Sequence, residues 1–441
     1  MTLKMIQAFL QDPYNDTAYL TGRAGTGKTT EIIDVCTYLY REQIPFVVCA
    51  YTHKACEVLA SKFPSELQPY ICTLHSFLGK RPGINDQALS LKHVDYNFTS
   101  STSVRPALLI IDEFSMVGEK DVMDIRAVQD PSTDTDKPMK VLLVGDTYQL
   151  PPVGDQQTIR PGGKYHVNLT ELKRTDKADL AEAMTKIIRY LDGSEPVQAL
   201  QSSANLVRGQ NIVQLYKEST EPNKKILAWT NEAVQSLNAA VMGRSEPSVG
   251  DILFCTSNRQ EYRYLGIVPP ERVTKVKTPM QDLELGSKYK TLEYLVSLPY
   301  ISFLAVEDLD TNEELVIATV FGMKNYLDKE KQLTGAAVAA NKSIATQHAT
   351  DSVTEWCKAN STTALANTRR KAWRECITFK DATMQLDFNH ALTVHKSQGS
   401  TYTEVYIDTD DLFKCADMSF QLYLRLMYVA ISRASQKVYT T

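Results

Sequence analysis

This chain of 441 residues lacks several features that define other protein classes. Its longest apolar stretches, residues 107–111 and 141–144, are far shorter than the roughly 20 residues that a membrane-spanning helix needs. The first residues show no secretory pattern of charge, apolar core and small cleavage site. No internal repeat or low-complexity tract is present. We therefore expect a globular protein without a membrane anchor.

A strong excess of one charge is also lacking. Lysine and arginine number 48 against 52 aspartates and glutamates, a net charge of −4. This excludes a basic nucleic-acid-binding tail, but it is compatible with a locally basic groove. The eight cysteines form no C-x-x-C pair, which favours reduced thiols and a cytoplasmic location. The length predicts two to four domains.

The first strong signal is the segment GRAGTGKTT at residues 22–30, which follows a strand-like run and precedes an amphipathic helix. This context is typical of a phosphate-binding loop, G-x-x-x-x-G-K-[ST]. Its glycines allow backbone N–H groups to face phosphate oxygens. We expect Lys28 to reach the β- and γ-phosphates of ATP and the Thr29 hydroxyl to bind Mg²⁺. The nucleotide-binding residues are Gly22, Arg23, Ala24, Gly25, Thr26, Gly27, Lys28, Thr29 and Thr30.

Two further apolar runs end in polar residues. The segment ALLIIDEFSM ends a buried strand in Asp112 and Glu113, and VLLVGDTYQLPPV carries Gln149. Asp112 suits the Mg²⁺ shell and Glu113 a general base for the attacking water. Gln149 could hydrogen-bond that water and the γ-phosphate. Taken alone, the carboxylates could be a solvated pair and Gln149 an ordinary loop residue.

A second cluster lies near the other end of the chain. The segment HALTVHKSQGSTYTEVYI, residues 390–407, reads as strand, polar glycine loop and strand. Near residue 426 a helix leads into a strand with Arg433 at the junction. An arginine in a second lobe without its own phosphate loop can supply the trans-acting cation of phosphoryl transfer, although a lone arginine is usually a surface residue.

The order of these blocks resembles superfamily 1 DNA helicases, most closely the phage Dda-type helicases of the RecD-like, 5′→3′ branch. The resemblance covers residues 22–434. It rests on the phosphate loop and on the blocks CAYTHKACEVL, TLHSFLG, LLIIDEFSM, LLVGDTYQLPPV, LTELKRT, ILAWTNEAVQSLN, LTVHKSQGSTYTEVYI and LYVAISRA, the last read across residues 422–434 without 424–426. One position departs from the family: Gln7 lies two residues too close to Phe9 for the usual adenine-reading glutamine.

The resemblance implies an α/β fold of two RecA-like P-loop lobes with ATP between them. A small β-hairpin insert would interrupt the first lobe, and a larger SH3-like and helical insert the second. The implied domains are a first lobe at 1–79 and 106–165, a pin insert at 80–105, a second lobe at 166–256 and 389–441, and an accessory domain at 257–388.

Residue roles follow from the same resemblance. Lys28, Glu113, Gln149 and the two arginines Arg174 and Arg433 would form the catalytic set, with both arginines on the γ-phosphate. Tyr96 and Phe98 would separate strands from the pin. The residues expected to grip single-stranded DNA without reading bases are Thr52, His53, Lys54, Thr73, His75, Thr230, Asn231, Thr393, His395, Lys396 and Ser397.

The function implied is an ATP- and Mg²⁺-dependent DNA helicase that moves on single-stranded DNA, 5′→3′, and unwinds forked duplexes in replication, recombination or repair. Replication or single-strand-binding proteins are candidate partners, the protein would act as a monomer, and a phage-encoded enzyme would work in the host cytoplasm. Two alternatives stay open: a translocase that barely unwinds, and a nucleotide-gated DNA-binding subunit of a nuclease or repair complex. A small-molecule kinase would not need the second cluster.

Overall fold

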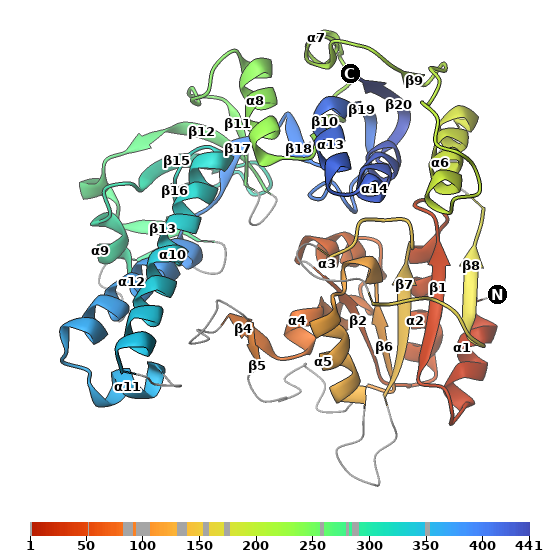
Figure 1. Ribbon diagram of the computed structural model, residues 1–441, viewed down its shortest axis with the longest axis horizontal. Helices are drawn as coiled ribbons and strands as arrows, with labels where there is room; N and C mark the ends of the chain where they lie inside the picture. Colours follow the sequence, from red (N-terminus) through yellow and green to blue (C-terminus); the bar gives the residue numbers. More distant parts are fainter. Residues whose placement is uncertain are drawn as a thin grey trace. The chain divides into compact units, whose positions relative to one another are not determined.

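The computed structural model describes residues 2–51, 53–82, 91–93, 106–129, 139–152, 158–171, 177–255, 260–278, 282–284, 291–348 and 353–441. The chain forms two compact units, which Figure 1 traces along the sequence. The first unit comprises residues 1–81, 93–230 and 392–441, and the second comprises residues 82–92 and 231–391. The second unit is therefore inserted into the sequence of the first.

The first unit contains two sheets, and a lobe is built around each. The first lobe takes in the described residues of 2–79 and 106–171, around a six-stranded sheet in which every pair of neighbouring strands is parallel. In spatial order its strands are β3 (Ile71–Thr73), β2 (Phe46–Ala50), β6 (Leu108–Ile111), β7 (Lys140–Gly145), β1 (Thr17–Gly22) and β8 (His166–Leu169).

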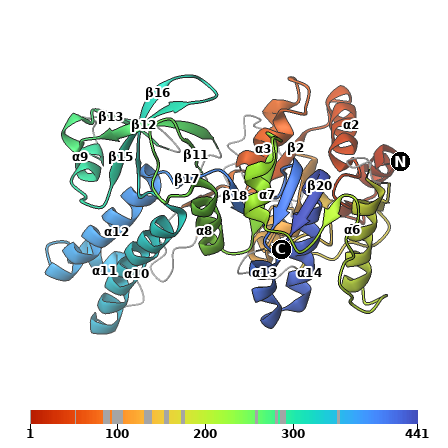
Figure 2. The ribbon, with the colours of Figure 1, turned by 90° about the horizontal axis from the view of Figure 1, so that it is seen from above.

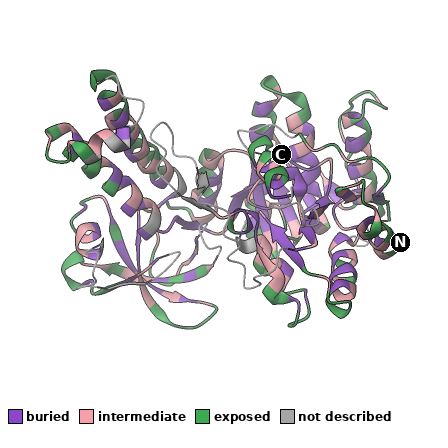
Figure 3. Ribbon diagram, turned by 90° about the horizontal axis from the view of Figure 1, so that it is seen from below, coloured by how far each residue is buried: buried purple, intermediate pink, exposed green. Residues whose placement is uncertain are grey.

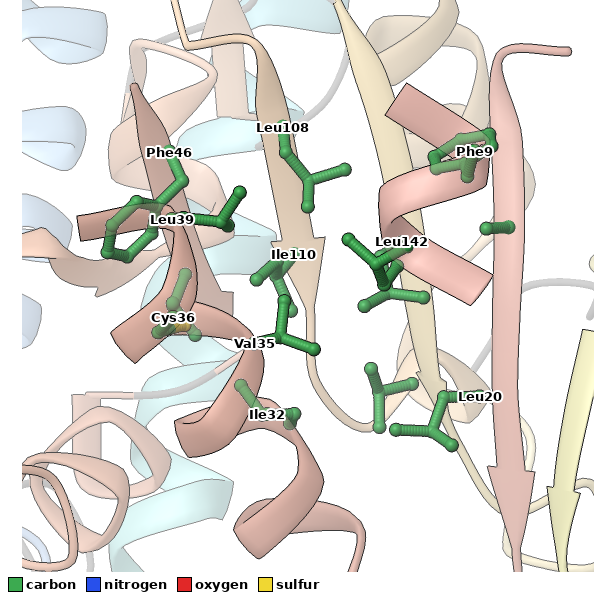
Figure 4. Close-up of a cluster of buried hydrophobic side chains, with 14 of the residues drawn as sticks. Phe9, Leu20, Ile32, Val35, Cys36, Leu39, Phe46, Leu108, Ile110 and Leu142 are labelled. Atoms are coloured by element: carbon green, nitrogen blue, oxygen red, sulfur yellow. The ribbon is translucent and has the colours of Figure 1, made fainter. Parts of the chain in front are cut away.

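Helices cover both faces of this sheet, because its central strands are apolar on both sides. Ile110 and Leu142 belong to the core shared with α1 and α2 (Figure 4), as does Val48. Leu109 and Leu143, next to them in the chain, belong to the core on the other face. The helical segments of the lobe are α1 (Thr2–Gln11), α2 (Lys28–Arg41), α3 (His53–Ala60), η1 (Gln68–Tyr70), α4 (Leu74–Phe77), η2 (Phe114–Met116) and α5 (Glu119–Gln129).

Helix α2 shows why this sequence is helical here. Its buried residues Ile32, Val35, Cys36 and Leu39 recur at the spacing that places side chains on one face of a helix. This apolar stripe lies against β1, β6 and β7 (Figure 4). The packing holds the start of α2 at the end of β1.

The second lobe takes in residues 177–230 and 392–441 around a five-stranded sheet. In spatial order its strands are β18 (Ala391–Thr393), β10 (Lys224–Ala228), β19 (Tyr402–Ile407), β20 (Ala434–Thr440) and β9 (Leu206–Val207), and the last four run parallel. Its helical segments are α6 (Ala178–Leu191), α7 (Ile212–Glu218), α13 (Thr409–Phe413), η4 (Lys414–Asp417) and α14 (Phe420–Ile431). The predicted α/β class is confirmed.

The second unit combines a seven-stranded sheet with helices. In spatial order its strands are β14 (Asp282–Glu284), β13 (Lys275–Lys277), β16 (Glu314–Thr319), β15 (Ser302–Asp308), β12 (Glu261–Val268), β11 (Ile252–Cys255) and β17 (Leu386–Phe388). The helical segments are α8 (Asn231–Met242), η3 (Pro270–Arg272), α9 (Thr291–Val296), α10 (Met323–His348), α11 (Val353–Ala359) and α12 (Ala364–Ala382). The predicted SH3-like form stays a prediction.

Helices α10 and α12 lie side by side in this unit (Figures 1 and 2). Trp373 and Phe379 of α12, two of the aromatics in the helix-prone part of the sequence, are buried in one core with residues of the sheet and α9. Strands β4 (Lys80–Pro82) and β5 (Leu91–His93) form a separate two-stranded sheet within the predicted pin insert.

Two predicted domain boundaries need correction. Residues 166–169 were assigned to the second lobe, but they form β8, which pairs in parallel with β1 of the first lobe from Tyr19 opposite His166 onward. Strand β11 was likewise assigned to the second lobe, but it lies between β12 and β17 in the sheet of the second unit. Strand β8 pairs with a strand that is distant in sequence, whereas β11 pairs with the neighbouring β12 as well as with the distant β17.

Buried residues line the sheets, and exposed residues lie on the outer faces of the helices (Figure 3). Within the described part of the chain, no helix is both long enough and apolar enough to cross a bilayer.

Replacing Leu142 with Ala should destabilise the first lobe. Leu142 is fully buried in β7, and its truncation leaves a cavity that the sheet cannot close. We expect the free energy of unfolding to fall by about 2–5 kcal/mol, measured by urea denaturation. Met123→Ala on α5, where the side chain is 60% exposed, is the control and should change it by less than about 0.5 kcal/mol. Equal stability of both variants would contradict the assigned core.

Candidate nucleotide and DNA site

The phosphate loop connects the end of β1 to the start of α2. Gly25 and Gly27 have φ angles of 83° and 90°, in the left-handed region that favours glycine. A Cβ on Gly22 would lie 2.5 Å from the Thr26 hydroxyl and 2.9 Å from the carbonyl oxygen of Leu169. The loop conformation therefore requires glycine at these positions, as the motif predicts.

Lys28 lies at the first position of α2 with its ammonium group turned into the loop. The Nζ atom donates to the carbonyl oxygens of Gly22 at 2.7 Å and Arg23 at 3.0 Å, and the residue is only 9% exposed. A buried ammonium group at a helix N-terminus adds to the positive end of the helix dipole. The loop is therefore a site for an anion.

Two adjacent carboxylates follow β6 at the same edge of the sheet. The Asp112 backbone N–H donates to the carbonyl oxygen of Cys49 at 2.8 Å, which fixes the end of the strand. Burial and the neighbouring Glu113 carboxylate raise the pKa of Asp112, and the Lys28 ammonium opposes this shift. The Asp112 carboxylate is thus held where added positive charge would be favourable.

Glu113 adopts a conformation that is unusual for a residue with a side chain. Its φ angle is 55°, and its buried Oε2 atom has no hydrogen-bond partner among the described residues. A strained backbone and an unpartnered buried carboxylate oxygen both cost free energy. Such costs are typical of a functional site, and a water molecule is a donor of the right size for this oxygen.

The segment after β7, residues 146–149, carries two buried polar side chains. Asp146 Oδ2 accepts hydrogen bonds from the Ala24 backbone N–H at 3.0 Å and from the Tyr428 hydroxyl at 2.7 Å. Gln149 Oε1 accepts one from Gln398 Nε2 at 3.3 Å. The sequence motifs predict Gln149 as a site residue, but not Asp146 or Tyr428. Asp146 could have been found, because it follows a buried strand just as Asp112 does.

Of the two predicted arginines, only Arg433 lies among the described residues. Arg433 follows the end of α14 and is 1% exposed. Its guanidinium donates to Ser432 Oγ at 2.8 Å and to the carbonyl oxygens of Val429 at 3.2 Å and Ser400 at 3.4 Å, all in its own lobe. Arg174 lies outside the described residues. The γ-phosphate contact of both arginines stays a prediction.

The predicted DNA contacts in the first lobe lie at the ends of β2 and β3. Thr73 caps α4, since its Oγ1 accepts from the Ser76 backbone N–H at 3.1 Å. His75 Nε2 lies 3.6 Å from Asp121 Oδ1, and its ring meets the Tyr51 ring edge-on at 5.0 Å between centroids. Thr52, Tyr96 and Phe98 lie outside the described residues, and His53 and Lys54 begin α3.

Thr230 and Asn231 lie where the chain passes from the first unit into the second. The Thr230 hydroxyl donates to Asp411 Oδ1 at 3.0 Å, and the buried Asp411 also accepts from the backbone N–H groups of Trp229 and Thr230. The Asn231 Oδ1 atom is buried and has no partner among the described residues. The block thus offers one satisfied and one unsatisfied polar group.

The last predicted DNA block, after β18, is a tight turn. Thr393 Oγ1 accepts from the Lys396 backbone N–H at 3.3 Å, and the fully buried Ser397 donates to the Val394 carbonyl oxygen at 2.7 Å. Burial lowers the pKa of His395, which favours its neutral form. The hydroxyl groups of this block therefore shape the turn, and their contact with DNA stays a prediction.

Two family models match the chain on either side of the second unit. An AAA domain matches residues 6–155, and a UvrD-like helicase C-terminal domain matches residues 388–441. The first covers the phosphate loop, both carboxylates and Gln149, and the second covers the turn after β18 and Arg433. The two clusters of predicted site residues therefore fall within the two matched segments.

Three curated proteins are also similar to this chain in sequence. Uncharacterized protein R530 of Acanthamoeba polyphaga mimivirus is 24% identical over 99% of this chain and 98% of its own length. ATP-dependent DNA helicase Pif1 of Psychrobacter is 31% identical over 31% of this chain. ATP-dependent RecD2 DNA helicase of Deinococcus radiodurans is 34% identical over 30% of it. The chain spans only 20% and 16% of these two helicases.

The similar solved structures include Pif1 helicase from Bacteroides, determined with ADP-AlF3 and single-stranded DNA. It is 16% identical, with a TM-score of 0.48, over 99% of this chain and 91% of that one. The chain is thus similar to an AAA domain in its first part and to a UvrD-like helicase C-terminal domain in its last part. Over about a third of its length it is also similar in sequence to the helicases Pif1 and RecD2.

Removing the Lys28 ammonium should weaken nucleotide binding without unfolding the protein. We expect Lys28→Ala to bind a fluorescent ATP analogue about 10- to 100-fold more weakly, because one charge-assisted contact is lost. Lys342→Ala, at an exposed position of α10, is the charge-matched control. Equal affinity of the two variants would exclude the loop as the nucleotide site, and circular dichroism checks that both are folded.

Proposed function

We propose that this protein is an ATP-driven DNA helicase that translocates 5′→3′ along single-stranded DNA and unwinds duplex DNA. The observation that carries the proposal is Glu113, next to Asp112, whose buried Oε2 has no hydrogen-bond partner in the part of the chain that the structure describes. A nucleotide-binding fold that only needed to bind ATP would gain nothing from this costly carboxylate. A hydrolase needs it to accept a proton from water.

In the proposed reaction, the phosphate loop and Lys28 bind the β- and γ-phosphates. Glu113 accepts the proton of the attacking water, Gln149 orients that water, and Arg174 and Arg433 stabilise the charge on the γ-phosphate. Arg433 would have to exchange contacts for this, since its guanidinium donates to the Val429 carbonyl oxygen and the Ser432 hydroxyl of its own lobe. Hydrolysis would then be linked to movement of the second lobe.

The residues present fit Mg²⁺. Thr29 and Asp112 offer a hydroxyl and a carboxylate, and the burial and the neighbouring Glu113 carboxylate that raise the pKa of Asp112 support a cation there. Among the described residues, no group of three or more potential protein ligands gathers in one place. This agrees with a cation that takes its other ligands from phosphates and water, as Mg²⁺ usually does. Bound there, it would neutralise charge on the nucleotide.

Single-stranded DNA would lie along the blocks that begin at Thr52, Thr73, Thr230 and Thr393. Support comes from the position of Thr73, Thr230 and Thr393 at or just after strand ends, and from the edge-on pairing of Tyr51 with His75, which offers aromatic surface. The pin insert, residues 80–105, with Tyr96 and Phe98, would separate the strands of a fork. The accessory domain would belong to the second unit.

Two other functions are less well supported. A nucleotide-gated DNA-binding subunit would not need the unpartnered Glu113. A translocase that barely unwinds would not need a pin, and β4 and β5 form the two-stranded sheet that a pin requires. We further propose a monomer of the phage Dda-type branch that acts in the cytoplasm, together with replication or single-strand-binding proteins.

Glu113→Gln should separate binding from hydrolysis. The amide keeps the shape of the side chain but cannot accept the proton, so we expect ATP hydrolysis to fall about 10²- to 10⁴-fold while ATP binding persists. Steady-state turnover with saturating single-stranded DNA measures the effect. Glu119→Gln, at an exposed position at the start of α5, should turn over like the unmodified protein. Normal turnover of Glu113→Gln would exclude Glu113 as the base.

Duplexes with a single-stranded tail on either side test the proposed function as a whole. With ATP and Mg²⁺, we expect a 5′-tailed duplex to be unwound, and a 3′-tailed or blunt duplex to stay intact. Strand release is followed with a fluorophore and quencher. Preferential unwinding of the 3′-tailed duplex would reverse the polarity. DNA-stimulated ATP hydrolysis without strand release would identify a translocase.

A further inference from the structure

One face of α14 in the second lobe contacts the segment after β7 in the first lobe. Arg425 and Tyr428 lie one helical turn apart on α14 and so share a face. Arg425 donates to the carbonyl oxygens of Thr147 at 2.7 Å and Gln149 at 2.6 Å. Tyr428 is fully buried and donates to Asp146 Oδ2. Three hydrogen bonds, to Asp146, Thr147 and Gln149, therefore connect this segment to α14.

The same segment is tied to the phosphate loop. Asp146 Oδ2 accepts from both the Tyr428 hydroxyl and the Ala24 backbone N–H, and the Ala24 N–H also lies 3.4 Å from the Tyr428 oxygen. A single buried carboxylate oxygen thus joins a loop amide to a side chain of the other lobe. The position of α14 is therefore linked, through Asp146, to the loop that would bind phosphate.

Further hydrogen bonds surround this connection. Tyr148 donates through its hydroxyl to Asp192 Oδ2 at 2.9 Å, and Arg23 donates to Thr185 Oγ1 at 2.7 Å, so that two more side chains of the first lobe reach the region of α6. The Tyr148 and Tyr428 rings also meet edge-on at 6.3 Å between centroids. Buried polar groups that are all satisfied favour one arrangement over others.

We infer that Tyr428 and Arg425 are positioning residues for the proposed ATP hydrolysis, and that they couple the place of the second lobe to the phosphate loop and to Gln149. The inference rests on the proposed function for its link to catalysis. Helix α14 ends just before Arg433, so the contacts that hold its face also set where this arginine lies relative to the loop. Neither residue needs to touch the nucleotide to act in this way.

Tyr428→Phe isolates the hydroxyl, because it keeps the ring and its contact with Tyr148. We expect kcat of DNA-stimulated ATP hydrolysis to fall about 10-fold, with KM for ATP changed less than about 2-fold, since positioning acts on the transition state more than on binding. Tyr423→Phe, on the same helix but away from residues 146–149, should keep both constants. A role in stability alone would instead lower the melting temperature and leave kcat per folded molecule unchanged.

Hydrogen exchange gives a readout that does not depend on activity. The Ala24 amide is protected by Asp146, which Tyr428 holds, so peptides covering residues 22–30 should exchange about 10-fold faster in Tyr428→Phe and not in Tyr423→Phe. Asp146→Asn should have a similar effect, and the double variant should change exchange and kcat by less than the two single effects combined.

The outcomes separate this inference from the proposed function. Unchanged kcat and unchanged exchange in Tyr428→Phe would overturn the inference, as would a loss of kcat without any change in exchange at the loop. If the unmodified protein shows no DNA-stimulated hydrolysis, the proposed function fails. Faster exchange in Tyr428→Phe would then still support the structural coupling, and unchanged exchange would overturn it.

Discussion

The parallel register of three strands is the constraint on which the candidate site depends. Thr21 lies opposite Gly145, and Ile111 lies opposite Leu143, so β1, β7 and β6 end at one edge of the sheet. Each strand is followed at once by a polar group that the fold must place: the phosphate loop, Asp146 and Asp112. A register slip is opposed by the packing on both faces, because a shift of one residue would exchange the side chains of the two cores and disrupt both. The positions of these polar groups at the sheet edge therefore depend on the packing of the core beneath them.

The sequence was most informative where local signals sufficed. The spacing of the phosphate loop and the apolar runs of β6 and β7 predicted the loop, Asp112, Glu113 and Gln149 at strand ends, as found. It failed for β8, a short strand with exposed His166 and Asn168, because its place depends on pairing with β1. Tyr428 was missed because it meets Asp146 across 282 residues of chain, a contact that no local pattern encodes.

The predicted DNA blocks show a different limit. Thr73, Thr230, Thr393 and Ser397 all use their hydroxyls within the protein: Thr73 caps a helix, Thr393 and Ser397 bond within a turn, and Thr230 donates to Asp411. Threonine and serine serve equally well as caps and as ligands for phosphate, so residue type alone does not separate the two roles. In this fold, the satisfied hydroxyls make rigid turns, and rigidity is itself useful where a backbone N–H must meet a passing phosphate.

The strand order of the second lobe has a consequence for how the chain is assembled. Strand β20 lies between β19 and β9, and β9 pairs with β20 across more than half the sequence. As the chain leaves the ribosome, residues 206–207 must wait for residues 434–440 before their partner exists. Meanwhile the whole insert, residues 231–391, can form its own cores. Synthesis therefore completes the second unit before the second lobe, which makes closure of the five-stranded sheet the late, non-local step of folding.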